Sequence, residues 1–224
     1  MYSEKTIEKY LTAMEKWLRF YTENIDTAHV SISDGNGKVG TIANVSTAAI
    51  LTCPHCKQCK YHCYDIRDCF KFGYDSITMQ ARAKNTAILL QDFARYFFEI
   101  RAFLKTYGGG YFRWHVGGET KDARYRDEMI ATAIMFPEIF FFTYTKEYAL
   151  WNEIKTLPGN LVVMYSEWRG LPMDNPHNRP VFKVRFKGED IPDGCTWKCP
   201  GKCEICRKAH RGCIAGENTW VDEH

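Results

Sequence analysis

Residues 111–166 decide the fold of this chain, and they read YFRWHVGGETKDARYRDEMIATAIMFPEIFFFTYTKEYALWNEIKTLPGNLVVMYS. Continuous apolar runs in this stretch are typical of strands buried on both faces, and the segments between them have helical character. The stretch predicts three strands, at 111–116, 139–144 and 161–166, separated by helices at 121–135 and 146–156. Because strands alternate with helices, we expect a parallel sheet whose two faces are covered.

The flanking sequence adds helices and strands on both sides of this stretch. Apolar side chains recur at three- and four-residue steps near the N-terminus, and a longer helical segment precedes the sheet. We expect helices at 4–22 and 76–106, strands at 29–33, 39–46 and 181–186, and little periodicity in 187–224. The two early strands flank the glycine-containing turn 34–37, which predicts a hairpin.

The length of the α/β stretch limits its architecture. A βα unit needs about 30 residues, so a complete eight-stranded barrel needs roughly 240, many more than residues 107–190 supply. We therefore expect a reduced or partial (β/α) barrel, or a small open α/β sheet, with an irregular cysteine-rich C-terminal tail. The predicted organisation is a single domain with an N-terminal helix (1–28), an α/β core (29–190) and the tail (191–224).

The composition excludes some classes of protein. The 224 residues carry a formal net charge of +3, and 45% of them are hydrophobic, as in a globular chain with a core. This charge is too weak to imply a nucleic-acid partner and too small to exclude one. The N-terminus is charged from Glu4, and no apolar run approaches the ~18 residues of a membrane span, so we predict no secretory signal, no membrane contact and a cytoplasmic location.

The ten cysteines fall into two groups. Five lie between residues 53 and 69, five lie between 195 and 213, and none lies between 70 and 194. In a reducing cytoplasm, clustered cysteines indicate metal binding rather than disulfides. Eight of them are candidate metal ligands, whereas Cys69 and Cys195 are predicted to be spare, with a small buried side chain as their simplest role.

The first thiol group comprises Cys53, Cys56, Cys59 and Cys63. Its C-x2-C-x2-C-x3-C spacing is the bacterial ferredoxin run, which favours an iron–sulfur centre, most simply a 4Fe-4S cluster. Zinc sites usually combine two C-x2-C knuckles separated by about a dozen residues or more. Zinc is therefore the second alternative for this group, and unbound thiols are the third.

The second thiol group comprises Cys199, Cys203, Cys206 and Cys213. The C-x3-C-x2-C spacing of its first three members is that of radical S-adenosylmethionine enzymes, but those enzymes carry it near the first barrel strand rather than in a tail. We therefore expect a closed structural cluster or a zinc site. Zinc competes more strongly here than in the first thiol group, because short irregular tails are often stabilised by zinc.

Polar residues follow the predicted strands at their carboxyl ends, where α/β sheets bind ligands. After the strand at 111–116, Gly117 and Gly118 would let a ligand approach the backbone, and Glu119 could accept hydrogen bonds from an ammonium group. His115 could orient a ligand or a cluster, and Ser166 at the end of the third strand is a further candidate cofactor ligand. The alternative is an ordinary strand-to-helix turn with Glu119 near a helix N-terminus.

These motifs together resemble the phage gene product 88 domain family. The family pattern of a Cys-Pro pair, a spaced Cys and a Cys-Tyr-Ala is matched by Cys53-Pro54, Cys59 and Cys63-Tyr64, with Asp65 in place of Ala. Its Arg-x-His-x-Ser-Gly-Asp strand end corresponds to 113–119, with Gly117 in place of Ser and Glu119 in place of Asp. The resemblance covers about 40–215 and is completed by segments 137–146 and 160–166 and by Cys199, Cys203, Cys206 and Cys213.

The resemblance implies a phage or prophage origin and an arrangement similar to that of radical S-adenosylmethionine proteins. In those proteins a cysteine loop holds a 4Fe-4S cluster with one open iron, and a Gly-Gly-Glu motif meets the methionine ammonium. Carried over, Cys53, Cys59 and Cys63 would hold the cluster, and Gly117, Gly118 and Glu119 would face S-adenosylmethionine. Cys56 departs from the family pattern, and a fourth thiolate there would close the open iron.

The leading hypothesis is a redox-active iron–sulfur protein with one or two clusters on a radical-SAM-like scaffold, either a reductive enzyme or an electron carrier. An enzyme would use His115 and Glu119 as catalytic candidates that position an unidentified small molecule, and a carrier would need an electron-transfer partner. The alternative is a binding module with zinc in both thiol groups and no catalysis. Such a module would contact protein or nucleic acid, for example through the basic and aromatic side chains of 57–74.

Overall fold

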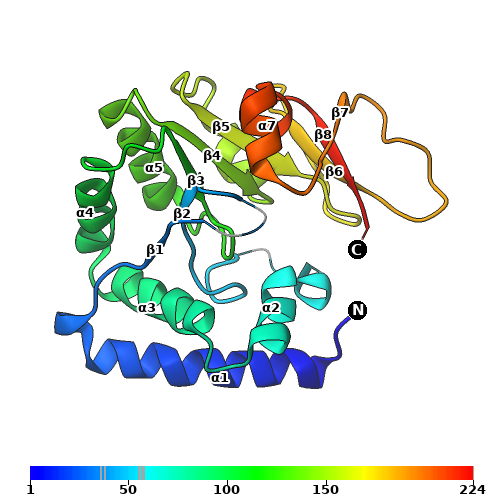
Figure 1. Cartoon of the computed structure of the whole chain (residues 1–224). Helices are drawn as coiled ribbons and strands as arrows, with labels where there is room; N and C mark the ends of the chain where they lie inside the picture. The colour runs from blue at the N-terminus through cyan, green and yellow to red at the C-terminus, as the bar shows by residue number, and fades with distance from the viewer. Residues whose placement is uncertain (36, 38, 55, 57–58, 224) are drawn as a thin grey trace. The chain divides into compact units, whose positions relative to one another are not determined.

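The computed structural model describes residues 1–35, 37, 39–54, 56 and 59–223 (Figure 1). The chain divides into two compact units. Unit 1 comprises Met1–Ile32, Val45–Tyr107 and His115–Lys121, and unit 2 comprises Ser33–Asn44, Gly108–Trp114 and Asp122–His224. The chain therefore passes between the units several times, and the single-domain organisation expected from the sequence stays a prediction.

Helices build most of unit 1. Helix α1 (Glu4–Glu23) begins at its N-cap Ser3, whose Oγ accepts a hydrogen bond from the Thr6 N–H at 3.2 Å, which confirms the predicted N-terminal helix. The single helix expected over 76–106 is instead two helices, α3 (Ile77–Gln91) and α4 (Phe93–Leu104). Asp92 separates them because its backbone is not helical and its carboxylate caps α4 by accepting from the Arg95 N–H at 3.0 Å.

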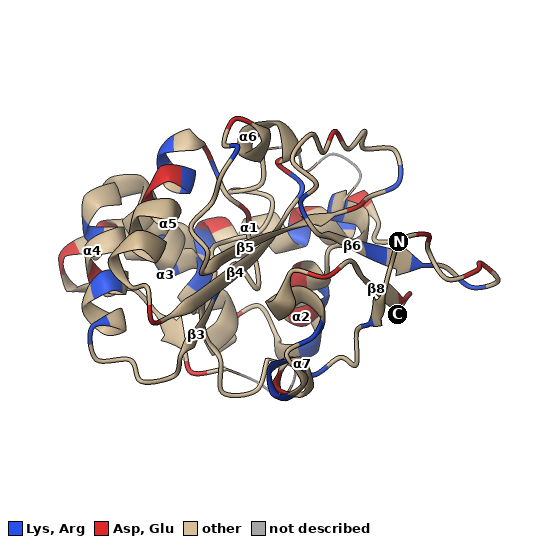
Figure 2. Ribbon diagram, turned by 90° about the horizontal axis from the view of Figure 1, so that it is seen from above, with Lys and Arg blue, Asp and Glu red and all other residues tan. Residues whose placement is uncertain are grey.

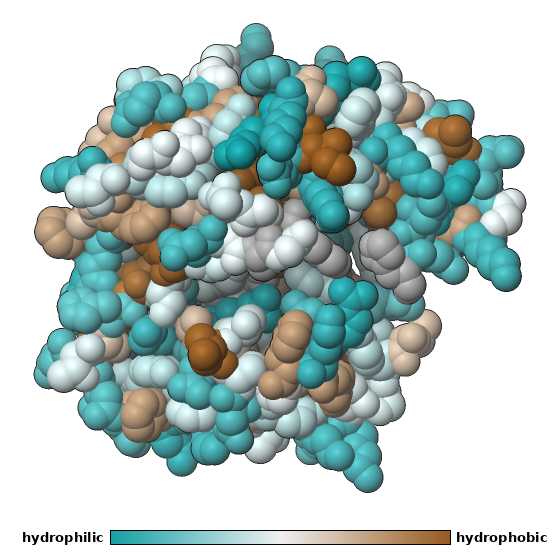
Figure 3. Space-filling model, in the orientation of Figure 1, coloured by the Kyte–Doolittle hydropathy of each residue, from teal (hydrophilic) through white to brown (hydrophobic). Residues whose placement is uncertain are grey.

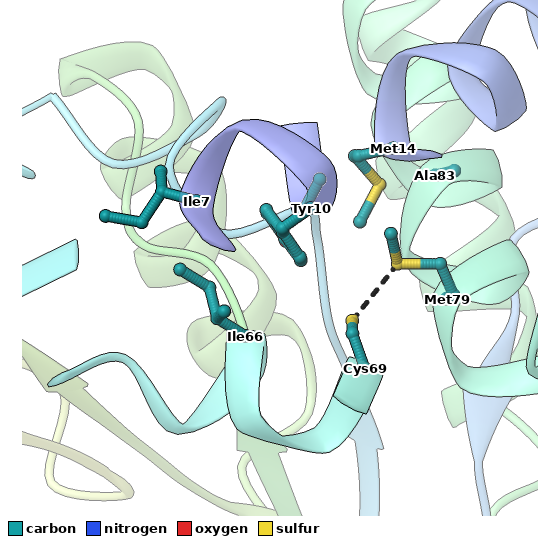
Figure 4. Close-up of a cluster of buried hydrophobic side chains, with 8 residues drawn as sticks. Ile7, Tyr10, Met14, Ile66, Cys69, Met79 and Ala83 are labelled. Carbon is teal, nitrogen blue, oxygen red and sulfur yellow. Dashed lines mark hydrogen bonds between the residues drawn. The ribbon is translucent and has the colours of Figure 1, made fainter. Parts of the chain in front are cut away.

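The first thiol group leads into a helix that the sequence pattern did not indicate, α2 (Tyr64–Phe72), which follows the short 3-10 helix η2 (Cys59–His62). A second 3-10 helix, η1 (Ile25–Thr27), follows α1. Helices α1, α2 and α3 enclose a small apolar core, which Figure 4 shows, formed by Ile7, Tyr10, Met14, Ile66, Cys69, Met79 and Ala83. The predicted spare thiol of Cys69 is buried in this core, 3.2 Å from the Met79 sulfur.

The strands form one sheet with the order β1-β2-β3-β4-β5-β6-β8-β7. Two strands, β1 (Ile32–Ser33) and β2 (Ala43–Val45), lie where the chain passes between the units. The other six belong to unit 2 and are β3 (Tyr111–Trp114), β4 (Phe140–Thr145), β5 (Leu161–Ser166), β6 (Val181–Arg185), β7 (Trp197–Lys198) and β8 (Thr219–Asp222). The pairs that link β3 through to β7 are all parallel. Helices α5 (Ala123–Met135) and α6 (Tyr148–Asn152) connect β3, β4 and β5. The mixed α/β class with a mostly parallel sheet is thereby confirmed.

The strands that decide the fold behave as their apolar runs predict. Strands β4 and β5 carry no charged side chain, as Figure 2 shows, and most of their residues are buried. The rings of Trp114 on β3 and Phe141 on β4 stack with their centroids 6.2 Å apart. Strand β3 ends at Trp114 rather than at residue 116, because His115 has a φ of 55°, which ordinary strands exclude.

The C-terminal tail corrects an expectation. Far from being irregular, it contains helix α7 (Cys203–Ala209), the 3-10 helix η3 (Gly212–Ala215) and strands β7 and β8. Strand β8 lies between β6 and β7 in the sheet. It has only four residues, a run too short to show a strand pattern in the sequence. The predicted hairpin strands, β1 and β2, are neighbours in the sheet but shorter than expected, and its turn includes residue 36, outside the described residues.

Large apolar side chains on the surface occur as separate spots in the face that Figure 3 shows. Those more than half exposed include Phe72, Ile77 and Phe98. Single exposed apolar residues of this kind are normal in folded proteins. Among the helices that the structure describes, none combines the length and the apolar character that crossing a bilayer requires.

Candidate metal centres

The first thiol group lies in unit 1 and begins with a tight turn. The Cys53 N–H donates to the Ile50 carbonyl at 3.3 Å, and the Cys56 N–H donates to the Cys53 carbonyl at 3.2 Å. This turn brings the two thiols into a hydrogen bond that raises the pKa of Cys53 well above its ordinary value, with burial and the Glu119 carboxylate adding to the effect. Residues 55, 57 and 58 of this loop lie outside the described residues.

The other half of the first thiol group is set by helix α2. Cys63 is the N-cap residue of α2, and Cys59 begins η2 one turn earlier. The pKa of the Cys63 thiol is raised to about 12, mainly by burial and also by the Asp65 carboxylate and Cys59. The N–H groups of Ile66 and Asp65 act in the opposite direction, because the start of a helix favours negative charge.

A buried ion pair supports this end of α2. Asp65 and Arg82 are 1% and 4% exposed, and Arg82 Nη1 contacts Asp65 Oδ1 directly. Asp65 Oδ2 also accepts from the Tyr10 hydroxyl at 3.2 Å and from the Ala49 N–H at 3.3 Å. Burial raises the pKa of Asp65, and Arg82 and these hydrogen bonds oppose that shift. The pair therefore joins α1, α2, α3 and the start of the cysteine loop.

Gly117 and Gly118 make room for this chain's own side chains. A Cβ on Gly117 would lie 2.7 Å from Asp65 Oδ1 and 2.9 Å from Arg82 Nε. A Cβ on Gly118 would overlap with Thr47 Oγ1, and the φ of Gly118 is 86°. Both glycines are thus required by packing within unit 1, which accounts for the Gly-Gly pair without a ligand.

The two catalytic candidates of the same segment are buried. His115 is 3% exposed and donates its backbone N–H to the Val45 carbonyl at 2.9 Å. Glu119 is 7% exposed and accepts from the Thr120 N–H at 2.7 Å. Because Glu119 also acts electrostatically on Cys53, the structure brings it to the first thiol group, whereas Ser166 belongs to unit 2.

The second thiol group gathers within unit 2. Cys199 acts electrostatically on each of Cys203, Cys206 and Cys213, and Cys203 also acts on Cys206. The backbone fixes the group at both ends, since the Cys199 N–H donates to the Trp220 carbonyl of β8 at 2.7 Å and the Gly216 N–H donates to the Cys213 carbonyl at 3.2 Å. The predicted ligands of the tail are therefore brought together, and the spare Cys195 is not among them.

Donors from the sheet and the tail approach these sulfurs. Burial raises the pKa of Cys203, Cys206 and Cys213, the last to about 11. Hydrogen bonds from the Arg113 guanidinium to Cys203 and from the Tyr144 hydroxyl to Cys213 oppose this shift. The Trp197 indole N–H opposes it at Cys206, although it has no well-formed hydrogen bond within the described residues. Such donors stabilise a thiolate and not a neutral thiol.

The Trp197 ring packs closely against the backbone of Gly212. A Cβ on Gly212 would lie 2.6 Å from Trp197 Cδ1, and Gly212 has a φ of 68°. Sequence reasoning missed this contact as well as the roles of Arg113 and Tyr144. The sequence places Arg113 in a predicted strand. The alternation of side chains along a strand gives the face on which a side chain lies, but not the distant residues that it contacts.

The cysteines of both units form a donor set that suits a thiophilic metal. Among the residues that the structure describes, no three Cys, His, Asp or Glu side chains lie close enough together to hold one metal ion. Thiols with raised pKa values stay protonated, and neutral thiols are not drawn toward one another by a shared cation. A bound cation removes their protons, because a coordinating thiol is deprotonated.

The basic and aromatic segment 57–74 has partners within unit 1. Phe70 packs against the rings of Tyr2 and Tyr74, with centroids 6.0 and 5.7 Å apart. Lys60 forms an ion pair with Glu4 at 3.5 Å. Residues 57 and 58 lie outside the described residues, and nucleic acid stays a predicted partner.

Comparison with known proteins gives one match. The family model described as Gene product 88 matches residues 8–170. The match includes the first thiol group and segment 115–119, and it ends before the second thiol group, earlier than the resemblance of the sequence suggests. No curated protein and no solved structure matches the chain.

Proposed function

The chain belongs to the gene product 88 family, and on that premise we propose that it is an iron–sulfur protein with one thiolate centre in each unit. The first and second thiol groups would each hold one centre. The observation that carries the proposal is the second thiol group, where four cysteines of the tail gather and Arg113, Trp197 and Tyr144 act to lower the pKa values of Cys203, Cys206 and Cys213 in turn. Thiols without a metal would gain nothing from that set of donors.

The spacing of the cysteines along the sequence supports a cluster over a single zinc ion in the first thiol group. Zinc binds sulfur at about 2.3 Å in a tetrahedron, which forces its four ligands into mutual contact. A 4Fe-4S cluster keeps its thiolates further apart, because each binds a different iron. The C-x2-C-x2-C-x3-C run of the first thiol group is typical of such clusters, which is why the proposal favours iron–sulfur over zinc there.

We also propose that the sheet is a partial (β/α) barrel similar to that of radical S-adenosylmethionine proteins. Its strands from β1 to β6 follow each other in sequence order, as the wall of a barrel requires. A doubly wound sheet reverses its strand order at a switch point instead. Among the strands that the structure describes, the order departs from the sequence at the C-terminal edge, where β8 precedes β7.

A bound cluster would supply one-electron chemistry. The residues around it would determine which molecule can exchange an electron with it. The partner in this proposal is an electron-transfer protein or a small molecule that is reduced. S-adenosylmethionine stays a prediction of the family resemblance and receives no role here. The Cβ directions of Gly117 and Gly118 are filled by Thr47, Asp65 and Arg82, so these glycines do not fit a cradle for that cofactor.

The proposal is tested by anaerobic purification of the full chain with measurement of iron, acid-labile sulfide and zinc. We expect a brown protein with broad absorbance near ~400 nm, bleaching by dithionite and about four irons per cluster. Cys53→Ser with Cys63→Ser should remove the iron of one centre, and Cys203→Ser with Cys206→Ser should remove that of the other. Cys195→Ser is the matched control and should leave the iron content unchanged.

A colourless protein with stoichiometric zinc would contradict the iron–sulfur proposal and favour the zinc-containing binding module. The single variant Cys56→Ala separates two forms of the first centre. Unchanged iron would leave a cluster held by Cys53, Cys59 and Cys63 with one open iron. Iron loss as complete as in Cys53→Ala would mean that four thiolates close the cluster.

A further inference from the structure

A pocket in unit 1 is formed without any residue of the two thiol groups. It has a volume of about 270 Å³ and is lined by α1, by α3 and by the segment that follows α1. Helices α1 and α3 pack against each other, as Figure 1 shows. The side chains that give the pocket its chemical character are Phe20, Tyr21, Asn24, Thr27, His29 and Lys84. All of them belong to unit 1, so the pocket is complete within that unit.

One wall of the pocket is aromatic. The rings of Phe20 and Tyr21 meet edge to face with their centroids 5.1 Å apart, and Trp17 packs against both, at 5.8 and 6.3 Å. The Tyr21 hydroxyl donates to Gln80 Oε1 at 3.3 Å, which fixes this ring against α3. Phe20 is 48% exposed. A planar ring that entered the pocket would bury this apolar surface.

Helix α3 adds a cation to the aromatic wall. Lys84 lines the pocket, and its ammonium nitrogen lies 5.8 Å from the centroid of the Tyr21 ring. Among the residues that the structure describes, no carboxylate forms an ion pair with Lys84. A cation without a counter-charge beside an apolar wall favours a ligand that brings a negative charge.

The backbone carbonyls at the end of α1 do not compete for this cation. The Phe20 carbonyl accepts from the N–H and the side-chain amide of Asn24, at 3.2 and 2.8 Å. The Asn24 carbonyl accepts from the N–H and the hydroxyl of Thr27, at 3.3 and 3.2 Å. Both acceptors are therefore satisfied by the chain itself, which leaves the charge of Lys84 for a ligand.

The carboxylate that contacts the edge of the pocket is already compensated. Glu99 Oε1 lies 3.3 Å from Nδ1 of His29, a side chain that is 78% exposed. Glu99 also accepts from the Val30 N–H at 2.6 Å and from Arg95 Nε at 2.7 Å. These donors offset the charge of Glu99, so an anion in the pocket meets little repulsion from it.

We propose that this pocket binds a small aromatic anion, a single planar ring that bears a carboxylate or a phosphate. The ring would contact Phe20 and Tyr21, and the anionic group would pair with Lys84. A cavity of ~150 Å³ holds one benzene ring, and sites for drug-sized ligands begin near ~300 Å³. A volume of about 270 Å³ therefore suits one ring with one substituent. This binding site goes beyond the proposed function, because it needs neither thiol group and no metal.

The test is calorimetric titration of the full chain with benzoate and with phenyl phosphate, which both combine a ring with a negative charge. Acetate and inorganic phosphate provide the charge without the ring, and benzyl alcohol provides the ring without the charge. We expect each aromatic anion to bind about 10-fold more tightly than these three, because it alone uses both parts of the pocket. The tighter of the two identifies the preferred anionic group.

Variants locate the charge. Lys84→Gln should weaken binding of both aromatic anions about 10-fold, the cost of losing a charged hydrogen-bond partner, and leave benzyl alcohol binding unchanged. Lys16→Gln is the matched control and should bind like the parent. Lys16 also lies beside an aromatic ring of α1, 5.0 Å from the Trp17 centroid, but it pairs with Asp75 at 3.4 Å and does not line the pocket.

A second pair of variants locates the ring. Phe20→Ala should weaken binding of benzoate and phenyl phosphate about 3- to 10-fold and leave acetate binding unchanged. Phe98→Ala removes another exposed phenylalanine of unit 1, on α4, and should have no effect. Labelling of the unaltered chain with acetic anhydride needs no variant. A bound aromatic anion should slow the acetylation of Lys84 and not that of Lys16.

Three results would overturn the inference. The first is binding of acetate, inorganic phosphate or benzyl alcohol as tight as that of the aromatic anions. The second is a Lys84→Gln protein that binds like the parent or like Lys16→Gln. The third is an acetylation rate of Lys84 that neither aromatic anion changes. The iron content of the protein has no bearing on these outcomes, so the iron–sulfur proposal and this inference can fail separately.

Discussion

The two thiol groups have the same ligands but opposite surroundings. In unit 1 carboxylates act on two of the thiols, Glu119 on Cys53 and Asp65 on Cys63. In unit 2 the second thiol group meets the guanidinium of Arg113 and the hydroxyl of Tyr144. Cysteine spacing therefore indicates where a metal would bind, whereas the surrounding charge decides how readily each group becomes a thiolate. We expect unit 2 to bind metal more tightly than unit 1.

The largest expected effect concerns the buried ion pair of unit 1. Asp65→Asn would leave the buried Arg82 paired with the partly exposed Asp68, 3.9 Å away, and we expect the free energy of unfolding to fall by about 3–5 kcal/mol. Urea unfolding of the full chain measures this loss. Asp222→Asn in unit 2 is the control, because its ion pairs with Arg185 and Lys198 are solvent-exposed and should change stability little. Equal stability of Asp65→Asn and the parent would mean that the pair does not support the cysteine loop.

A second prediction tests whether the Gly-Gly pair serves packing. Gly118→Ala places a Cβ against Thr47 Oγ1 at a φ of 86°, so backbone strain and overpacking should together cost about 2–4 kcal/mol. Thermal unfolding of the apo-protein measures the effect without any ligand. Gly159→Ala in unit 2 is the matched control, because nothing lies within 4 Å of its added Cβ. If Gly118→Ala were as stable as Gly159→Ala, a role for Gly118 in binding would regain support.

The sequence predicted the parallel α/β core because 139–144 and 161–166 are apolar runs. Strands of this kind are buried on both faces and therefore lie in the interior of the sheet. The sequence did not indicate α2, because the buried face of this nine-residue helix includes the charged Asp65, which breaks the apolar pattern. The sequence could name the ligand candidates, since cysteine spacing is local. It could not find Arg82 beside Asp65 or Arg113 beside Cys203, because these contacts join segments far apart along the chain.

A third prediction concerns Glu99, a carboxylate of unit 1 whose negative charge is stabilised by a backbone N–H and a guanidinium. Burial acts to raise the pKa of Glu99, but the Val30 N–H and the Arg95 guanidinium outweigh it and hold this pKa below its ordinary value of 4.5. Glu99 therefore stabilises the folded state above pH 4.5, and that contribution is lost as the pH falls through the lower folded-state pKa. We expect Glu99→Gln to lose about 1 kcal/mol at pH 7, after allowance for solvent screening. Urea unfolding at pH 7 and near pH 3.5 should show the difference shrinking at low pH, whereas a constant difference would contradict the assigned shift.

The smallest expected effect compares the two centres directly. Glu119→Gln removes the carboxylate that acts on Cys53, and it should strengthen Co²⁺ binding at the first thiol group about two- to five-fold. The titration uses a parent with Cys203→Ser and Cys206→Ser, so that only unit 1 binds. Weaker binding in Glu119→Gln would instead identify Glu119 as a metal ligand or as a residue that orients one.

The position of β8 has a consequence for the order in which the chain is made. The Cys199 N–H bonds to the carbonyl of Trp220 on β8, and β8 joins β6 to β7. A ribosome releases residues 219–222 after every cysteine of the chain has already emerged. A chain cut short just after Cys213 would thus carry all ten thiols and still lack the strand that arranges the last four. If the second thiol group binds metal as proposed, a product truncated before residue 219 should bind it less stably, because it lacks β8.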